Sequence, residues 1–462
     1  MIDFLIFYEV GVREFESIAL LGHELIKRGY SVDYFGFEDA DHNKYIKNRK
    51  RISKYYNNVD TAIMPSLYHD KEIYNTVYYV CGHCKHIVNL RWEQYFGNGP
   101  MQDMNSALFP QEDAKKAYHL CWGAKSYESL LIRGNEKNFL PITGAIQLDF
   151  LRPEFSDFYM GRKELFKKYN LDVGKKTVLY ISSFATATRT ERLKEAVKKD
   201  FAGKYDFKDD TFSFHKESYE ITIEWIETFL KKYPNVQFIY RPHPAENETE
   251  KIYRLEQYEN FRNVSDYSVK QWIVCCDIVT TWVSTSIVEA YFAGKYCYII
   301  RPLPYPQDID ICVYNGAKYI NTLDDFLKIS KANEEPSIEE RKIREYYSVQ
   351  DNRASYIRTA DFLEIIIKQG VAFEWDSDKA HVFDKKRRML FMRNIIFNIY
   401  SIGLTFFMKI YRKTGIKFPR IVQVRIDNLQ TAIEKKKNRR SSLKEELNIT
   451  IDRINRYFDM RL

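Results

Sequence analysis

Short apolar runs alternate with amphipathic stretches over the first 150 residues. Runs rich in β-branched and aromatic residues predict strands over residues 3–8, 31–36, 61–64, 76–80, 87–90, 119–122 and 139–142. Helical spacing of the apolar positions predicts helices over residues 14–28, ending at Gly29, and over residues 124–133, ending at Gly134. Because strands and helices alternate, we predict a parallel sheet flanked by helices, in an α/β domain over residues 1–150.

The same alternation resumes after residues 149–159, an aperiodic stretch with a proline that predicts an interdomain connection. Strands are predicted over residues 176–182, 236–240, 277–281 and 296–300, and helices over residues 219–232 and 285–293. Ligands of open α/β sheets bind beyond the carboxyl ends of the strands, so the loops at 182–190, 241–246 and 281–286 are expected to face one cleft. We predict a second α/β domain over residues 160–375.

The pattern changes in the last part of the chain, residues 380–462. Residues 389–411 are rich in Phe, Ile, Leu and Met but are interrupted by Arg393, Asn394, Asn398 and Lys409. Such interruptions argue against a transmembrane span and favour a helix that lies in a membrane interface. We predict a basic, amphipathic helical extension. The alternative is that this stretch packs as an ordinary helix on the second domain or in a dimer.

The net charge of +8 is concentrated in this extension. Residues 381–462 contain 20 Lys and Arg against 7 Asp and Glu, a net +13, so residues 1–380 carry −5. An acidic body with a basic extension predicts an anionic partner, either membrane phosphates or nucleic acid. The sequence contains no recognisable nucleic-acid-binding module. We therefore expect residues 385–440 to contact an anionic membrane surface, and we expect no nucleic-acid partner.

Composition indicates a folded protein. The 462 residues are 45% hydrophobic and 29% charged, values that argue against bulk disorder. Seven scattered cysteines do not make a disulfide framework and favour a reducing compartment. The first residues read as a strand and not as a signal peptide. We therefore expect a cytoplasmic protein, associated peripherally with the inner face of the plasma membrane.

The sequence Arg-Pro-His-Pro at residues 241–244 ends the predicted strand 236–240. Its two prolines prevent further strand pairing, so the chain must turn and present Arg241 and His243 at the carboxyl edge of the sheet. A guanidinium and an imidazolium there can neutralise a phosphate leaving group. The alternative is a plain surface turn. We predict that both side chains bind the phosphate of a ligand, with His243 also acting in catalysis.

A run of hydroxyl residues, Ser284, Thr285 and Ser286, follows the predicted strand 277–281 at the start of a helix. Hydroxyls at this position can cap backbone N–H groups, and a helix start can also receive a phosphate. Capping explains at least one of the three, and three in succession favour an anion site. Glu289, one turn further, can reach a ribose or sugar hydroxyl or can support the cap.

Two further hydroxyls belong to the same candidate site. Ser182 and Ser183 lie where the predicted strand 176–182 enters a loop rich in Ser and Thr. Because this loop is expected to face the same cleft, we add both residues to the predicted donor-binding set.

Together these motifs resemble the donor-binding half of GT-B glycosyltransferases from bacterial surface carbohydrate pathways. The resemblance rests on the turn at 241–244, on residues 284–290 and on Gly294-Lys295, and it extends to residues 12–16 and 143–153. It implies an α/β GT-B fold, with two Rossmann-like domains facing a central cleft and a helical C-terminal extension. It also implies transfer without a metal or other cofactor, from a nucleotide-sugar donor to a carbohydrate or lipid-linked acceptor.

Within that class, the His-Pro pair with a downstream Ser/Thr cluster resembles sialyltransferases and Kdo transferases, which use CMP-sugars, and CDP-glycerol-dependent teichoic acid polymerases. Both resemblances imply a cytidine nucleotide. The chain departs from the sialyltransferase pattern because its N-terminal half has no Asp/Glu-Asp/Glu-Gly triplet. The rival enzymes are a CDP-glycerol-type glycerophosphotransferase and a UDP-sugar 2-epimerase, and the rival from another class is a nucleic-acid-binding protein that uses the basic extension.

Transfer to a hydroxyl requires a base that removes the hydroxyl proton. The candidates are Glu93, which follows the predicted strand 87–90, and Glu14, which follows the first strand. Either can equally be a solvated or ion-paired carboxylate. Cys81 and Cys84 form one Cys-x-x-Cys pair without a second pair, which is weak evidence for zinc, so we predict no metal site.

Overall fold

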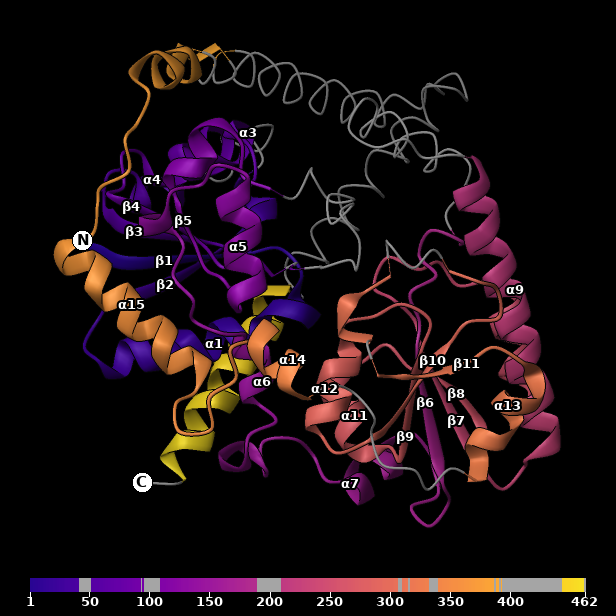
Figure 1. Ribbon diagram of the computed structural model, residues 1–462. Helices are drawn as coiled ribbons and strands as arrows, with labels where there is room; N and C mark the ends of the chain where they lie inside the picture. Colours follow the sequence, from indigo (N-terminus) through magenta and orange to yellow (C-terminus); the bar gives the residue numbers. More distant parts are fainter. Residues whose placement is uncertain are drawn as a thin grey trace, which may run out of the picture.

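Two parallel sheets organise the molecule, each flanked by helices (Figure 1). The computed structural model describes residues 1–40, 51–92, 94, 109–188, 209–305, 310–314, 316–331, 340–385, 388–389, 392 and 443–460. The predicted α/β fold of the GT-B kind, with two Rossmann-like domains and a helical C-terminal segment, is confirmed.

The first sheet has five parallel strands in the order β2-β1-β3-β4-β5. They are β1 (Ile2–Tyr8), β2 (Val32–Gly36), β3 (Val59–Met64), β4 (His86–Asn89) and β5 (Tyr118–His119). The helices of this domain include α1 (Gly11–Lys27), α3 (Asp70–Glu72), α4 (Tyr79–Cys81), α5 (Ala124–Ile132) and α6 (Ile146–Asp149). Helix α1 ends before Gly29, whose φ of +91° lies in the left-handed region that glycine adopts readily.

Two strand predictions in this domain are wrong. Residues 76–80 belong to a π-helical turn, Ile73–Tyr78, that continues into α4. This segment is apolar and largely buried, and a short buried helix has the same composition as a buried strand. Residues 139–142 follow a 3₁₀ turn, Lys137–Phe139, and form a single parallel bridge between Ile142 and Cys121 in place of a strand.

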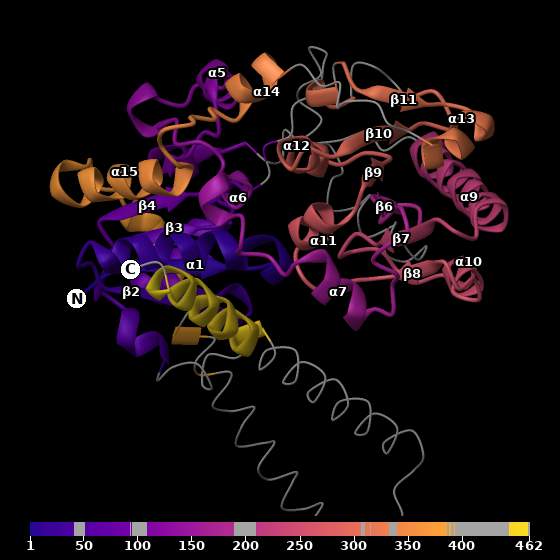
Figure 2. The ribbon, with the colours of Figure 1, turned by 90° about the horizontal axis from the view of Figure 1, so that it is seen from below.

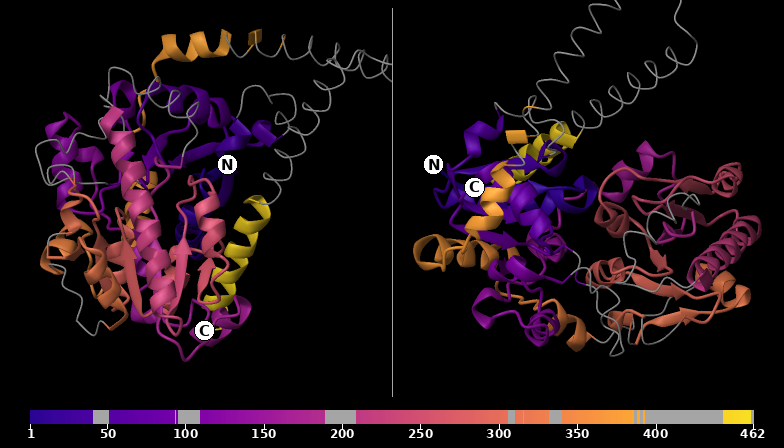
Figure 3. Two further views of the ribbon diagram at one scale, coloured as in Figure 1. Left: turned by 90° about the vertical axis from the view of Figure 1, so that its right-hand side faces the viewer. Right: turned by 90° about the horizontal axis from the view of Figure 1, so that it is seen from above.

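The second sheet has six parallel strands in the order β11-β10-β9-β6-β7-β8. They are β6 (Thr177–Ile181), β7 (Gln237–Arg241), β8 (Phe261–Asn263), β9 (Ile278–Thr281), β10 (Tyr296–Ile300) and β11 (Lys318–Ile320). Helices α7 (Arg162–Lys168), α11 (Val269–Cys275) and α12 (Ser286–Phe292) lie toward the first domain (Figure 2). Helices α9 (Asp209–Lys232), α10 (Glu250–Leu255) and α13 (Leu323–Lys328) cover the outer face, along which α9 runs (Figure 3).

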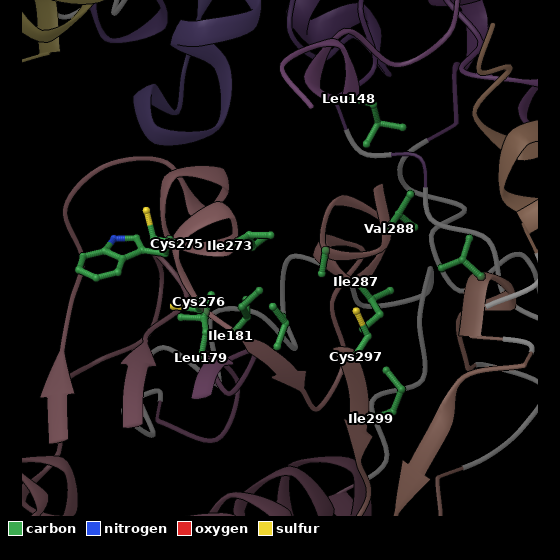
Figure 4. Packing of buried hydrophobic residues seen from close by; sticks show 14 of the residues in the cluster. Leu148, Leu179, Ile181, Ile273, Cys275, Cys276, Ile287, Val288, Cys297 and Ile299 are labelled. Atoms are coloured by element: carbon green, nitrogen blue, oxygen red, sulfur yellow. The ribbon is translucent and has the colours of Figure 1, made fainter. Parts of the chain in front are cut away.

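An apolar core joins α11 and α12 to the face of the second sheet that is turned toward the first domain. Figure 4 shows Ile287 of α12 near Cys297 of β10, while Val288 of α12 lies on the side toward Leu148, and these side chains are buried. Leu148 of α6 belongs to the same cluster. Apolar packing is therefore continuous from one domain to the other.

After the second sheet, the chain returns to the first domain. Helix α14 (Glu340–Tyr346) contacts α5, and α15 (Ser355–Gln369) packs on α1 and α6. Gly123 is required at the first of these contacts, because a Cβ atom there would lie 2.2 Å from the backbone oxygen of Glu345. Residues 340–369 therefore cover the first domain although they follow the second in sequence.

A helix over residues 443–459 lies along α1 (Figure 2). The His23 ring stacks on Phe458 with 4.5 Å between ring centroids, and His23 Nδ1 lies 2.8 Å from Asn455 Oδ1. Leu447 and Ile454 are buried in the core of the first domain. The end of the chain is therefore anchored on the N-terminal domain.

Most of the stretch 389–411 and most of residues 385–440, where we expect contact with the membrane surface, lie outside the described residues. Among the helices that the structure describes, none is long and apolar enough to cross a membrane.

Candidate functional site

A cleft of about 580 Å³ lies between the two domains. Loops after β6, β7 and β9 line it from the second domain, and residues after β1, β4 and β5 line it from the first. The expectation that the loops at 182–190, 241–246 and 281–286 face one cleft is confirmed by the described parts of these loops. The lining residues on which the site depends are Glu9, Arg13, Trp92, Trp122, Gln147, Ser182, Arg241, His243, Lys270, Ser284, Thr285, Ser286 and Glu289.

The Arg-Pro-His-Pro turn follows β7 and borders the cleft. His243 is exposed, and its Nδ1 accepts a hydrogen bond from the backbone amide of Ala245 at 3.1 Å. A neutral His243 ring must therefore carry its proton on Nε2. Arg241 lines the cleft but is 7% exposed, and it donates to the backbone oxygens of Asp266 and Tyr267. Burial lowers the pKa of Arg241 to about 10, so the side chain stays charged at neutral pH.

A buried carboxylate, Glu246, holds this turn in place. It accepts hydrogen bonds from Ser182 Oγ at 2.6 Å, from the Tyr240 hydroxyl and from the His243 amide at 3.3 Å. Burial raises the pKa of Glu246, and the hydrogen bonds lower it in part. Ser182 lines the cleft, but its hydroxyl is engaged in this network. Ser183 accepts from the Val283 amide at 3.1 Å and is outside the described lining of the cleft.

The hydroxyl cluster lies at the start of α12, as predicted. Ser284 Oγ accepts from the Ser286 amide at 3.2 Å, so one hydroxyl acts as a local cap. The Tyr314 hydroxyl accepts from the Ser284 amide and donates to the Ser284 carbonyl at 3.0 Å, which fixes the loop. Thr285 is the N-cap residue of α12 and makes no side-chain cap hydrogen bond. All three hydroxyl residues line the cleft.

A lysine between two carboxylates spans the domains. Lys270 Nζ lies 3.2 Å from Glu16 Oε2 of α1 and 3.8 Å from Glu289 Oε1 of α12, and the lysine side chain is 5% exposed. Glu16 also accepts from Tyr159 Oη at 2.8 Å and from Ser268 Oγ at 2.9 Å. Burial raises the pKa of Glu289, and the Lys270 charge counteracts this. A buried cation therefore borders the cleft near the hydroxyl cluster.

The two predicted bases have different positions. Glu14 is fully buried and accepts from the Glu9 amide at 2.7 Å and from Arg13 at 2.9 Å, and it is outside the described lining of the cleft. Burial raises its pKa. Glu93 lies outside the described residues, so its role stays a prediction. Glu9 follows β1 directly, is exposed and lines the cleft.

Several residues of the site were missed in the sequence. Glu9 could have been found, because it is the first residue beyond the first predicted strand. Glu16 lies in the segment 12–16 that carries part of the resemblance, whereas Lys270 carries no sequence signal, since it reads as an ordinary polar position near a helix start. Cys81 and Cys84 are buried in the apolar core of the first domain.

No protein-family model matches the chain, and no curated protein matches it in sequence. The solved structures that it is similar to include a UDP-GlcNAc 2-epimerase of Methanocaldococcus jannaschii in complex with UDP-GlcNAc and UDP. That structure is 11% identical, with a TM-score of 0.49 over 79% of this chain and 99% of that one. A UDP-GlcNAc 2-epimerase from Neisseria meningitidis bound to UDP-GlcNAc is 12% identical, with a TM-score of 0.48 over 80% and 100%. A variant of the wall teichoic acid polymerase TagF with CDPG is 12% identical, with a TM-score of 0.47 over 79% and 89%. With TM-scores below 0.5, these likenesses assign no activity to this chain.

Proposed function

We infer that the protein is a glycosyltransferase that moves a sugar from a nucleotide-activated donor to a hydroxyl of a surface polysaccharide or glycolipid. The observation that carries this proposal is the composition of the cleft. Its second-domain wall has three basic side chains, Arg241, His243 and Lys270, beside the hydroxyls of residues 284–286. Phosphates are bound in proteins by such groups.

The donor's diphosphate or phosphate binds along this wall. His243 donates from Nε2 to a phosphate oxygen, and the buried ammonium of Lys270 offsets charge that develops on the leaving group. The bond between the anomeric carbon and the phosphate oxygen breaks as the acceptor oxygen bonds to that carbon. The acceptor proton then needs a carboxylate on the opposite wall. Glu9 takes this role, and Glu93 stays the alternative.

The cytidine nucleotide in this proposal is supported by the sequence resemblance alone. Thermal unfolding of the full chain with CMP, CDP, UDP and GDP tests it, because a ligand that binds the native state stabilises it by about 2.7 kcal/mol at one hundred times its Kd. We expect CMP or CDP to raise Tm most, and to do so in the presence of EDTA. If no nucleotide raises Tm, the proposal is wrong.

His243→Ala tests the site itself. We expect transfer to be lost while the Tm stays near that of the wild type, because His243 is an exposed turn residue. His381→Ala removes another exposed histidine, away from the cleft, and is the matched control. Wild-type turnover by the His243 variant would remove this residue from the mechanism.

The same assays distinguish the rival enzymes. Stabilisation by UDP together with acceptor-independent conversion of UDP-GlcNAc to its 2-epimer would identify an epimerase. Stabilisation by CDP with consumption of CDP-glycerol would identify a glycerophosphotransferase. Each outcome would replace the transfer of a sugar as the activity of this cleft.

The proposal includes attachment to an anionic membrane through the basic residues 385–440. Its support is the net charge of +13 in residues 381–462, where each Lys or Arg near an anionic leaflet contributes about 1 kcal/mol. Sedimentation of the full chain with anionic and with neutral vesicles at low salt tests it. Equal sedimentation with both would contradict it, and salt-sensitive binding to RNA without vesicle binding would favour a nucleic-acid partner.

A further inference from the structure

Two buried polar atoms on the first-domain wall of the cleft have no hydrogen-bond partner within the described part of the chain. They are Nε1 of Trp92 and Oε1 of Gln147. Trp92 is 7% exposed, so its N–H group is removed from water as well as from protein partners. Buried polar groups in native proteins are nearly always paired, and an unpaired one at a cleft therefore indicates where a ligand completes the pairing.

The two atoms have complementary chemistry. The indole N–H of Trp92 is a donor only, and the amide oxygen of Gln147 is an acceptor only. A hydroxyl group can accept from the first and donate to the second. A phosphate or an ionised carboxylate can accept from Trp92 but offers no proton to Gln147, and an ammonium has no lone pair for Trp92. The pair is therefore matched to a neutral hydroxylated group.

Two aromatic rings border the same wall. The Trp122 ring stacks on the Tyr347 ring with 5.5 Å between centroids and 22° between planes. Both residues line the cleft, as does Leu148, but the rings are only 5% and 3% exposed, so they offer the cleft little more than their edges. Such edges can contact the C–H groups of a sugar ring while the ring hydroxyls reach polar groups beside them.

The wall is held rigidly by backbone contacts. Gln94 Nε2 donates to the Arg91 and Leu120 carbonyls at 3.2 and 3.0 Å, and Gln94 Oε1 accepts from the Trp122 amide at 3.0 Å. This side chain therefore ties the segment after β4, which carries Trp92, to the segment after β5, which carries Trp122. A wall fixed in this way needs little reorganisation to bind a ligand.

We propose that Trp92 and Gln147 bind hydroxyls of a neutral carbohydrate ring that lies in the cleft beside Trp122 and Tyr347. The name acceptor for this ring rests on the proposed function, but the binding of a neutral sugar does not. The acceptor end is then a neutral glycan residue, and an acceptor whose terminal unit is a phosphate or an acidic sugar is disfavoured.

Two substitutions test the site with little change in shape. Trp92→Phe keeps an aromatic ring and removes the N–H, and Gln147→Met keeps the chain length and removes the oxygen. The probes are methyl β-glucoside, methyl β-galactoside and methyl β-N-acetylglucosaminide, with glycerol 3-phosphate as the charged comparison, titrated into the full chain by ligand-observed NMR. Each variant is expected to weaken binding of the best neutral probe about fivefold, the loss expected for one hydrogen bond.

Trp375→Phe is the matched control, because it removes an indole N–H that donates to the Cys84 carbonyl at 3.0 Å outside the cleft. It is expected to leave sugar binding unchanged. Unchanged sugar binding in both Trp92→Phe and Gln147→Met, or a loss of glycerol 3-phosphate binding in both variants as large as the loss of sugar binding, would overturn the proposal. If Trp92→Phe does not fold, Gln147→Met decides alone.

Nucleotide binding, measured separately from sugar binding, distinguishes failure of this site from failure of the proposed function. Sugar binding that falls in the two variants while no nucleotide binds would leave this site standing and refute the proposed function. Nucleotide binding that is intact in both variants, with unchanged sugar binding, would refute this site alone.

Discussion

Replacing Lys270 with methionine removes one buried positive charge from the cleft and keeps most of the volume of the side chain. The ammonium lies 3.2 Å from Glu16 and 3.8 Å from Glu289, and its side chain is 5% exposed. In the proposed mechanism this charge is close to the donor phosphate. We therefore expect Lys270→Met to weaken nucleotide binding.

The magnitude follows from the interaction that is lost. A hydrogen bond to a charged group contributes about 1.5–3 kcal/mol, which corresponds to a roughly 10- to 150-fold rise in Kd. The fold also loses stability, because removing one partner of a buried ion pair costs about 3–5 kcal/mol. We expect the lower end of this stability cost for two reasons. Glu16 keeps its hydrogen bonds from Tyr159 and Ser268, and the raised pKa of Glu289 makes protonation of that carboxylate easier.

Glu16→Gln separates the phosphate contact from the interdomain contact. This variant removes the carboxylate charge next to Lys270 but keeps an oxygen that accepts from Ser268 or Tyr159. The lysine charge is then less neutralised, so nucleotide binding is expected to stay the same or to tighten a few-fold. The two variants should therefore change nucleotide affinity in opposite directions, although both disturb the same ion pair.

Isothermal titration of the full-length variants with the nucleotide that most stabilises the wild type measures both effects. Lys328→Met is the control, because Lys328 is exposed on α13 in the second domain and pairs with Asp325. It is expected to bind as the wild type does. Equal weakening in Lys270→Met and Glu16→Gln would refute the reasoning, since it would mean that Lys270 acts only by joining the domains.

Two further predictions concern the segments that return to the first domain. Gly123→Ala places a Cβ against the backbone of α14 and is expected to cost about 2–3 kcal/mol in the free energy of unfolding, whereas Gly161→Ala, which meets open space and only replaces the glycine N-cap of α7, should cost no more than about 1 kcal/mol. Chemical denaturation compares them, and equal values would contradict the contact. Burial raises the pKa of Asp149, which caps the start of α15, from 3.8 to about 6. The protonated form of Asp149 therefore favours the folded state. Its contribution to the free energy of unfolding is largest below pH 3.8 and falls by about 3 kcal/mol as the pH rises to about 6. The free energy of unfolding of Asp149→Asn should lack this fall between pH 4 and 6. If the free energies of unfolding of the variant and the wild type change in parallel with pH, the assignment to Asp149 is refuted.

Sequence patterns predicted the elements that depend on local chemistry. The helices before Gly29 and Gly294 end where predicted, because glycine at φ of +91° and +66° stops each helix through its own backbone freedom. The turn after β7 could be predicted because its prolines cannot pair in a sheet. These signals depend on residues close in sequence. Together with the ends of the predicted strands, they predicted that three loops face one cleft.

The parts that failed depend on contacts between distant residues. Glu14 follows the first strand in sequence, yet its side chain is buried in the domain and accepts a hydrogen bond from the Glu9 backbone amide. Glu16 looks like a solvated residue of α1, but Ser268 and Lys270 cover it from the second domain. Helix α15 follows the second domain in sequence, yet Ala360, Leu363 and Ile366 pack in the core of the first domain. Spacing along the chain contains no information on such pairings.

The two walls of the cleft differ in charge, and local structure explains the difference. On the second-domain wall, Arg241 and Lys270 are held by backbone carbonyls and by carboxylates, so their charges are fixed before any ligand binds. On the first-domain wall, Trp92, Trp122 and Gln147 form a neutral patch beside the charged Glu9 and Arg13. A fixed positive wall stabilises charge that develops on a leaving phosphate without reorganisation. The neutral patch of Trp92, Trp122 and Gln147 opposite it neither competes for that phosphate nor repels a hydroxyl. A charge introduced by Gln147→Glu should therefore impair binding of a neutral ring more than it impairs nucleotide binding.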